Sequence, residues 1–256
     1  MSRIDPSFAY SQARLQARYG ARPRVADWSQ IEATADLGAL IQLLRASPLA
    51  GWTGLLGSRP GPHEIERHVR AEWLRRVDEV ASWQPSAWRD GILWLRWIAY
   101  LPALQKLARG GRAQAWMRDD AVLGPVVARE PRERATALRR TPLAPLARGF
   151  LPPHEMAAAW TGHWRQLWPP HDLGSAPIEA LIRIASRERD RLARLPDDCS
   201  STETLRALER RFQLGFRRHP LSPAAAVAYL GLLAFDLRRV RGALATRALH
   251  EVTAEP

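Results

Sequence analysis

Residues 223–250 read PAAAVAYLGLLAFDLRRVRGALATRALH, and this stretch decides the fold class. Its apolar residues recur three or four positions apart, which places their side chains on one face of an α-helix. Pro223 suits the first turn of a helix, where its missing N–H costs no hydrogen bond. The pattern predicts a long helix from Pro223 to about His250, whose apolar line faces the body of the protein: Val227, Leu230, Leu233, Leu237, Val240 and Leu244.

Four shorter apolar stripes have the same helical spacing, and prolines separate the segments that carry them. No segment shows the alternation and β-branched enrichment of strands, and no Asn-Gly hairpin signal occurs. The sequence therefore predicts an all-α fold with roughly nine to eleven helices. Ser200 and Glu203 have the spacing of a capping box before the last of these stripes. The stripes consist of Leu37, Leu40, Ile41 and Leu44; Ile65, Val69, Trp73, Val77 and Val80; Leu181, Ile182, Ala185, Leu192 and Leu195; and Leu205, Leu208 and Phe212.

Two short motifs occur twice in the same order. LRASPLA at 44–50 is echoed by LRRTPLA at 138–144, and PHEI at 62–65 is echoed by PHEM at 153–156. Trp73 and Trp164 each lie nine residues after the glutamate of the second motif. Because proline and glutamate are common at helix starts, the second motif alone is weak evidence. The shared order and tryptophan register favour an internal duplication.

The charge balance is strongly basic. The 256 residues include 38 Lys and Arg against 26 Asp and Glu, which gives a net charge of +12. Lys106 is the only lysine, and Cys199 is the only cysteine, so an intrachain disulfide is excluded. We expect no secretory signal, because residues 1–20 contain no apolar core, and no membrane-spanning helix, because no run of about 18 apolar residues occurs. Such a basic chain suits nucleic acid, anionic lipid or an acidic protein as partner.

No arrangement of residues points to catalysis or to a metal. His154-Glu155 begins like a zinc-protease helix, but Ala158 stands where the second histidine is needed. Cys199 follows Asp197 and Asp198, whose charges oppose formation of a thiolate. We therefore expect no catalytic residue, no metal, no cofactor and no small-molecule substrate.

The eleven tryptophans are the most informative aromatic feature. Trp88, Trp94 and Trp97 flank Arg89 and Arg96, an interleaving that can stack on single-stranded nucleic acid. Tryptophans are more often core residues or anchors at protein interfaces, and we expect Trp73, Trp94 and Trp97 to be mostly core. A second triplet predicts one aromatic helix face: Trp160, Trp164 and Trp168.

Three stretches together resemble a known family. The first is FAYSQARLQAR at 8–18, continued by LGALIQLL at 37–44. The second is EIERHVR at 64–70, followed by LWLRW at 93–97 and KLARG at 106–110. The third runs from HPL at 219–221 through AYL at 228–230 to DLRRVR at 236–241. In this order they resemble the central-stalk subunit of V-type and A-type rotary ATPases, called C in prokaryotes and d in eukaryotes.

The resemblance implies a fold. The family has pseudo-symmetric, repeated helical lobes around a central hollow, so we expect one all-α domain over 1–256. The approximate lobes are 1–110, 111–196 and 197–256. The chain is shorter than typical family members, and the missing length falls between about Gly110 and Asp197. The middle lobe is therefore expected to be reduced, as in a short, divergent member.

The resemblance also implies a function. It suggests a non-catalytic adaptor, peripheral on the cytoplasmic face of the membrane, that couples the rotor shaft subunits to the proteolipid ring. The alternative is a basic, helical nucleic-acid-binding protein. The matched motifs contain the basic residues expected to contact partners: Arg96, Lys106, Arg109, Arg238, Arg239 and Arg241.

Overall fold

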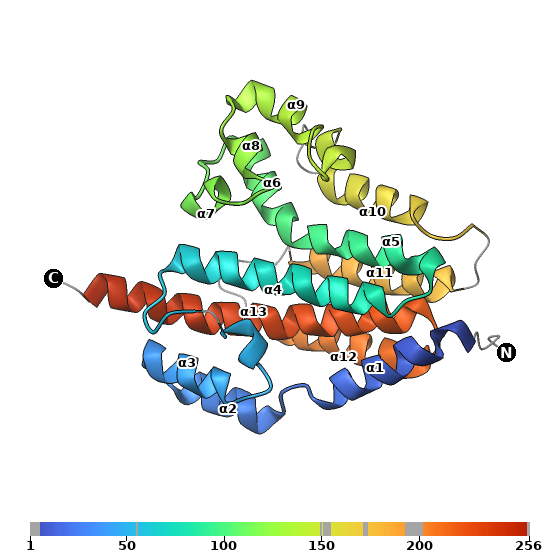
Figure 1. Cartoon of the computed structure of the whole chain (residues 1–256), viewed down its shortest axis with the longest axis horizontal. Helices are drawn as coiled ribbons and strands as arrows, with labels where there is room; N and C mark the ends of the chain where they lie inside the picture. Colours follow the sequence, from blue (N-terminus) through green and yellow to red (C-terminus); the bar gives the residue numbers. More distant parts are fainter. Residues whose placement is uncertain are drawn as a thin grey trace. The chain divides into compact units, whose positions relative to one another are not determined.

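A computed structural model describes residues 6–54, 56–148, 150, 155–170, 174–192 and 202–254. Within these ranges every regular element is a helix and none is a strand, which confirms the predicted all-α fold (Figure 1). The α-helices are α1 (Ala9–Gly20), α2 (Val25–Ala33), α3 (Leu37–Arg45), α4 (Pro62–Ser82), α5 (Ser86–Trp94), α6 (Leu101–Ala108), α7 (Ala115–Arg118), α8 (Gly124–Val127), α9 (Arg134–Leu138), α10 (Met156–Gln166), α11 (Ser175–Leu192), α12 (Thr202–Arg218) and α13 (Pro223–Ala254). The 3-10 helices are η1 (Pro6–Phe8), η2 (Ala50–Trp52), η3 (Leu95–Tyr100), η4 (Pro131–Glu133) and η5 (Ala144–Ala147).

The long last helix forms as predicted, because α13 begins at Pro223 and continues to Ala254. Its apolar line is buried except at Leu237, which is half-buried. The stripes of α3 and α4 are also buried, as their spacing predicts. None of the helices in the described ranges combines the length and apolar character needed to cross a bilayer.

The stripes of α11 and α12 are covered less completely. Leu181 is buried, but Ile182, Leu205 and Phe212 are only half-buried. Leu195 and Ser200, the predicted cap, lie outside the described residues.

The chain divides into two compact units. The first comprises Met1–Arg22, Arg76–Ile92 and Trp168–Arg239, and the second comprises Pro23–Arg75, Leu93–Leu167 and Val240–Pro256. Each unit draws residues from all three predicted lobes. The lobes themselves stay a prediction.

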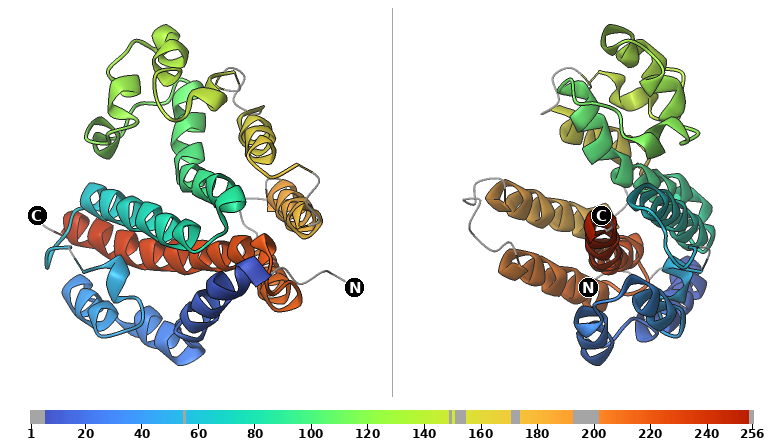
Figure 2. Two further views of the ribbon diagram at one scale, coloured as in Figure 1. Left: turned by 45° about the vertical axis from the view of Figure 1, so that its right-hand side comes forward. Right: turned by 90° about the vertical axis from the view of Figure 1, so that its left-hand side faces the viewer.

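In the first unit α11 and α12 run side by side (Figure 2). The Tyr19 ring stacks on Phe216 with centroids 4.5 Å apart. Gly231 of α13 lies directly under the Phe212 ring of α12, since a Cβ built there would be 2.3 Å from two ring carbons. Only glycine fits this contact without movement of Phe212, so α12 and α13 depend on it to approach closely.

Tryptophans organise the second unit. The Trp73 Nε1–H on α4 donates to the carbonyls of Leu95, at 3.3 Å, and Arg96, at 3.2 Å. The Trp94 Nε1–H donates to the Trp160 carbonyl at 3.2 Å, which joins α5 to α10. Trp73 and Trp94 are therefore core residues, as predicted, whereas Trp97 is only half-buried.

The predicted aromatic face of α10 holds for two of its three residues. Trp160 and Trp164 are buried on α10, with ring centroids 5.3 Å apart. Trp168 lies beyond the end of α10 and is half-buried. It belongs to the first unit, where its ring centroid is 6.1 Å from that of Trp88.

The first repeated motif adopts the same local structure in both copies. Ser47 Oγ donates to the Leu44 carbonyl at 2.7 Å and accepts from the Leu49 N–H at 3.1 Å. Thr141 Oγ makes the equivalent bonds, 2.8 Å and 3.2 Å long, to Leu138 and Leu143. In each copy a helix ends, a proline follows on the exposed side, and a 3-10 helix begins. The pair of segments is therefore structurally, as well as sequentially, repeated; Pro153 and His154 of the second motif lie outside the described residues.

Candidate functional site

A hollow of about 170 Å³ opens in the first unit between α12 and α13. The residues that line this hollow recur at helical spacing on both helices, so each helix faces the hollow with one side. Phe235 supplies an apolar wall and meets the Phe212 ring edge-on, with centroids 6.1 Å apart. The lining consists of Thr202, Leu205, Arg206 and Glu209 from α12 and of Phe235, Arg238 and Arg239 from α13.

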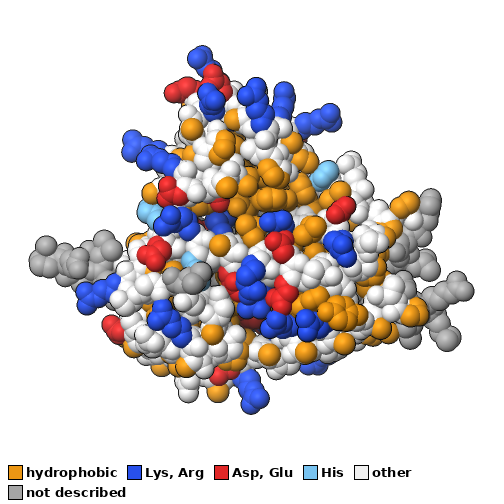
Figure 3. Space-filling model, in the orientation of Figure 1, with side chains coloured by type: hydrophobic (Ala, Val, Ile, Leu, Met, Phe, Trp, Pro, Cys, Tyr) orange, Lys and Arg blue, Asp and Glu red, His pale blue; other side chains and the backbone are white. Residues whose placement is uncertain are grey.

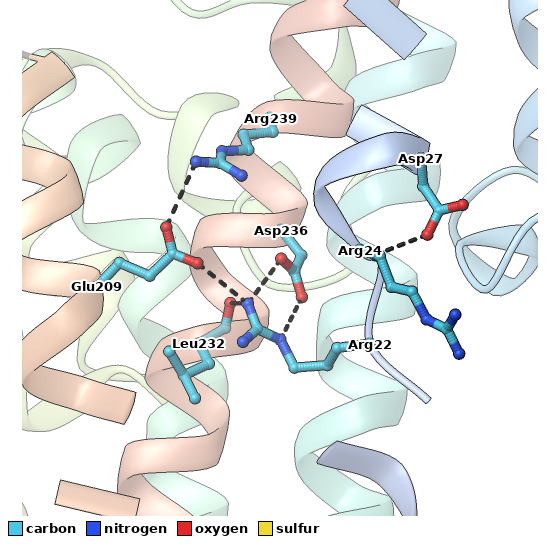
Figure 4. A network of polar contacts seen from close by, with 7 residues as sticks. All are labelled: Arg22, Arg24, Asp27, Glu209, Leu232, Asp236 and Arg239. Atoms are coloured by element: carbon cyan, nitrogen blue, oxygen red, sulfur yellow. Dashed lines mark hydrogen bonds and ion pairs between the residues drawn. The ribbon is translucent and has the colours of Figure 1, made fainter. Parts of the chain in front are cut away.

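A buried ion pair lies beside the hollow. Asp236 is 1% exposed, within the buried face of α13. Arg22, just beyond the end of α1, reaches it with two hydrogen bonds of 2.8 Å, from Nε to Oδ2 and from Nη2 to Oδ1 (Figure 4). This two-pronged geometry is the strongest form of an arginine–carboxylate contact.

Glu209 connects the ion pair to the hollow. One carboxylate oxygen lies 3.3 Å from Arg22 Nη2, and the other lies 3.4 Å from Arg239 Nη2 (Figure 4). The resulting chain of four charged side chains joins the end of α1, α12 and α13. It holds the guanidinium of Arg239 in a defined place at the edge of the hollow.

Burial and charge act in opposite directions on this network. Burial raises the pKa of Asp236 above its ordinary value, and the hydrogen bonds and positive charge of Arg22 oppose that rise. Burial lowers the pKa of Arg22, but Asp236 and Glu209 outweigh it, so the pKa of Arg22 is raised overall. Arg22 therefore stays cationic at every physiological pH.

The hollow is net positive. Arg206, Arg238 and Arg239 contribute three guanidinium groups to its lining against the single carboxylate of Glu209. Guanidinium groups bind carboxylates and phosphates through paired N–H donors. A small anionic group with an apolar neighbour fits this combination of arginines, Leu205 and Phe235.

The structure brings two of the six predicted contact residues together at this hollow. Arg238 is exposed and Arg239 is half-buried, and both line it from the same face of α13. Their predicted neighbour Arg241 belongs to the second unit, where its Nη1 lies 3.6 Å from Glu66 Oε1.

The other three predicted contact residues lie in the second unit. Arg96, in η3, is half-buried, and its guanidinium is 5.4 Å from the centroid of the Trp97 ring. Lys106 and Arg109 are exposed at the end of α6. The six residues therefore do not form a single site within either unit.

Neither Arg22 nor Glu209 was predicted from the sequence as part of this site. Asp236 is the residue from which a buried ion pair could have been predicted. It lies between Leu233 and Val240 on a buried helix face, and a carboxylate there needs a buried partner. Its partner lies 214 positions away. Helical spacing says nothing about contacts over such separations.

The remaining polar motifs have structural partners. Asp119 pairs with Arg67 at 3.3 Å, and Asp120 accepts from the Tyr100 hydroxyl at 2.9 Å and from the N–H groups of Val122 and Leu123. Across the described parts of the chain, no three His, Cys, Asp or Glu side chains are close enough to hold a metal ion. Four residues of the motifs compared with catalytic and metal sites lie outside these parts: His154, Asp197, Asp198 and Cys199.

The tryptophans do not form a stacking surface. Trp88, Trp94, Trp160 and Trp164 are at most 5% exposed. Half-buried Trp97 packs edge-on against Tyr100, with ring centroids 5.4 Å apart. The interleaved aromatics that favoured nucleic acid are thus mostly engaged in packing.

No family model matches the chain, and neither a curated protein nor a solved structure is significantly similar to it.

Proposed function

We propose that this protein is a non-catalytic adaptor of a V-type-like rotary ATPase, which links the rotor shaft to the proteolipid ring on the cytoplasmic face of the membrane. The proposal rests on the order of the three family-like stretches in the sequence. It includes no substrate and no cofactor. It assigns the protein to protein–protein contact and to the transmission of torque.

The hollow between α12 and α13 is the structural observation that best supports the proposal. Arg238 and Arg239 belong to the third family-like stretch, DLRRVR, and both line this hollow. The net positive lining suits an acidic side chain of a shaft subunit, and Phe235 suits an apolar neighbour of that side chain. A volume of about 170 Å³ accommodates a side chain rather than a whole helix.

The ion-pair network supports the mechanical part of the proposal. An adaptor that transmits torque needs a contact surface that does not yield under load. Arg22 ties the end of α1 to Asp236 and Glu209, and Glu209 holds Arg239. The contact residue is therefore anchored to three elements of the unit.

The repeated local structure supports the lobed architecture that belongs to this proposal. The matching bonds of Ser47 and Thr141 suit two lobes related by duplication. The arrangement we propose has pseudo-symmetric lobes around a central hollow and a reduced middle lobe. A further match between α4 and α10 is that Trp73 and Trp164 are both 3% exposed.

Purification from native membranes tests the proposal. The full chain, tagged and produced in its own cells, is isolated in mild detergent, and its partners are identified by mass spectrometry. We expect the two large nucleotide-binding subunits, the shaft subunits and the proteolipid to co-purify with it. Recovery of the chain with nucleic acid, and without any rotary-ATPase subunit, contradicts the proposal and supports the alternative function.

A further inference from the structure

One continuous segment of the second unit carries half of the chain's net charge. Residues 106–148 contain ten of the chain's 38 basic residues but only four of its 26 acidic ones. This sixth of the chain therefore carries +6 of the total net charge of +12. A basic excess of this size attracts anionic partners.

The basic side chains of this segment face outward. Nine of the ten are exposed, and Arg134 alone is half-buried. Figure 3 shows Lys and Arg side chains gathered over the part of the molecule built by α8 and α9. We call this the basic surface, and its members include Lys106, Arg109, Arg129, Arg132, Arg139 and Arg140.

Few acidic groups neutralise the basic surface. Asp119 pairs with Arg67, outside the segment, and Asp120 is occupied by Tyr100 and by backbone N–H groups. The other two acidic residues, Glu130 and Glu133, are exposed among the arginines but form no ion pair with a described residue. Within the described residues, Arg129, Arg132, Arg139 and Arg140 form no ion pair. Their guanidinium groups are therefore exposed to solvent, where an anionic partner could reach them.

A packed scaffold supports these charges, although its helices are short. Buried apolar residues fix each of them: Met117, Leu123, Val126 and Leu138 have exposed fractions of 0%. At the end of α6 the Gly111 N–H donates a hydrogen bond to the Lys106 carbonyl at 2.9 Å, and the Gly110 N–H donates one to the Leu107 carbonyl at 3.1 Å. With Gly110 at a φ of 79°, this is a Schellman ending, which fixes the backbone beside Lys106 and Arg109.

The type of partner follows from what accompanies the arginines. Trp116 is the only aromatic residue of the segment, and it is 2% exposed, so no ring is presented for stacking on bases. Guanidinium groups without aromatic neighbours suit a plane of phosphate groups, where each cation adds to the attraction. We infer that the basic surface binds the anionic phospholipid headgroups of a membrane. This inference holds whether or not the protein serves a rotary ATPase.

Vesicle binding by the full chain tests the inference. The vesicles contain phosphatidylcholine alone or with about one third phosphatidylserine, and binding is measured by sedimentation. We expect binding only to the anionic vesicles, with a decrease as salt rises from about 0.1 M to about 0.5 M. The fourfold variant Arg129→Gln, Arg132→Gln, Arg139→Gln and Arg140→Gln should bind at least about tenfold more weakly.

A matched control removes the same charge elsewhere. Arg183, Arg187, Arg189 and Arg191 are exposed on α11 of the other unit, and their fourfold change to Gln should leave most of the binding intact. An equal loss in both variants shows a general charge effect and overturns the inference, as does wild-type binding to neutral vesicles. Tighter binding to a random duplex oligonucleotide of equal phosphate content, at physiological salt, overturns it in favour of nucleic acid.

Discussion

Arg22 and Asp236 are 214 positions apart in the chain, yet two hydrogen bonds of 2.8 Å join their side chains in the interior of one compact unit. Asp236 is 1% exposed, so neither charge is tolerated without the other. The pair fixes the end of α1 against α13. It also places Glu209, and through it Arg239, at the hollow where we propose partner binding.

Replacing one member of this ion pair should destabilise the folded protein. The change Arg22→Met leaves the Asp236 carboxylate buried without its cation, and we expect unfolding to become easier by about 3–5 kcal/mol. Urea unfolding followed by circular dichroism measures this change. The double variant Arg22→Met, Asp236→Leu removes both charges and should recover much of the loss; a double variant no more stable than the single one contradicts the assignment.

Gly231 provides a test of close helix packing. The change Gly231→Ala places a methyl group against the Phe212 ring, and we expect a loss of about 1–3 kcal/mol from overpacking. Gly242 lies on the same helix with nothing within 4 Å of the position of a Cβ. The control Gly242→Ala should therefore stabilise the protein by about 0.5–1 kcal/mol, because alanine favours the helix. Similar effects of both changes in thermal unfolding rule out the contact with Phe212.

Replacing Trp94 or Trp97 with alanine should reduce stability by different amounts, although the two residues lie only three positions apart. Trp94 is 5% exposed and donates to the Trp160 carbonyl, so Trp94→Ala should cost about 3–5 kcal/mol. Trp97→Ala should cost clearly less, since the Trp97 side chain is only half-buried. Chemical denaturation of both variants measures the difference, and equal losses are inconsistent with the structure.

The raised pKa of the buried Tyr229 hydroxyl leads us to expect a loss of stability at alkaline pH. Burial raises the pKa of its hydroxyl to about 12, while nearby Arg76 and Arg18 oppose the rise. In the unfolded chain the hydroxyl ionises near its ordinary pKa of about 10. The stability that the neutral hydroxyl contributes is therefore fully present below a pH of about 10. It is lost as the pH rises through about 12, which lowers the free energy of unfolding by about 2–3 kcal/mol.

The change Tyr229→Phe isolates this contribution. The variant should lose less stability than the wild type between the two pKa values, because phenylalanine does not ionise. Denaturation at a series of alkaline pH values measures the difference. Parallel curves for the two proteins contradict a raised pKa of Tyr229.

The spacing of apolar residues predicted burial correctly for the helices whose apolar stripes are fully covered by other parts of the protein. The stripes of α3, α4 and α13 are nearly all buried, because helical spacing alone decides which side faces the core. The stripes of α11 and α12 have the same spacing but are partly exposed, because helical spacing does not show how completely neighbouring helices cover a stripe. The 3-10 helix η3 interrupts a stretch whose composition does not distinguish it from an α-helix.

The candidate site was predictable only in part. Arg238 and Arg239 were selected from a motif, and both lie at the hollow. Arg241 is only two positions further along the same helix, but its charge is turned to Glu66 instead. Arg22 is a typical exposed arginine by sequence, and only the folded chain brings it to Asp236.

The most direct test of the adaptor function is the affinity for purified shaft subunits of the rotary ATPase from the same cells. The variant Arg206→Gln, Arg238→Gln, Arg239→Gln removes the positive lining of the hollow, and the α11 variant of Arg183, Arg187, Arg189 and Arg191 serves as the charge control. With thermal unfolding used to verify folding, we expect the hollow variant to raise the Kd by at least about tenfold and the control to leave it nearly unchanged. Shaft subunits that fail to bind the wild-type chain, or that bind the hollow variant as tightly as the wild type, contradict the account.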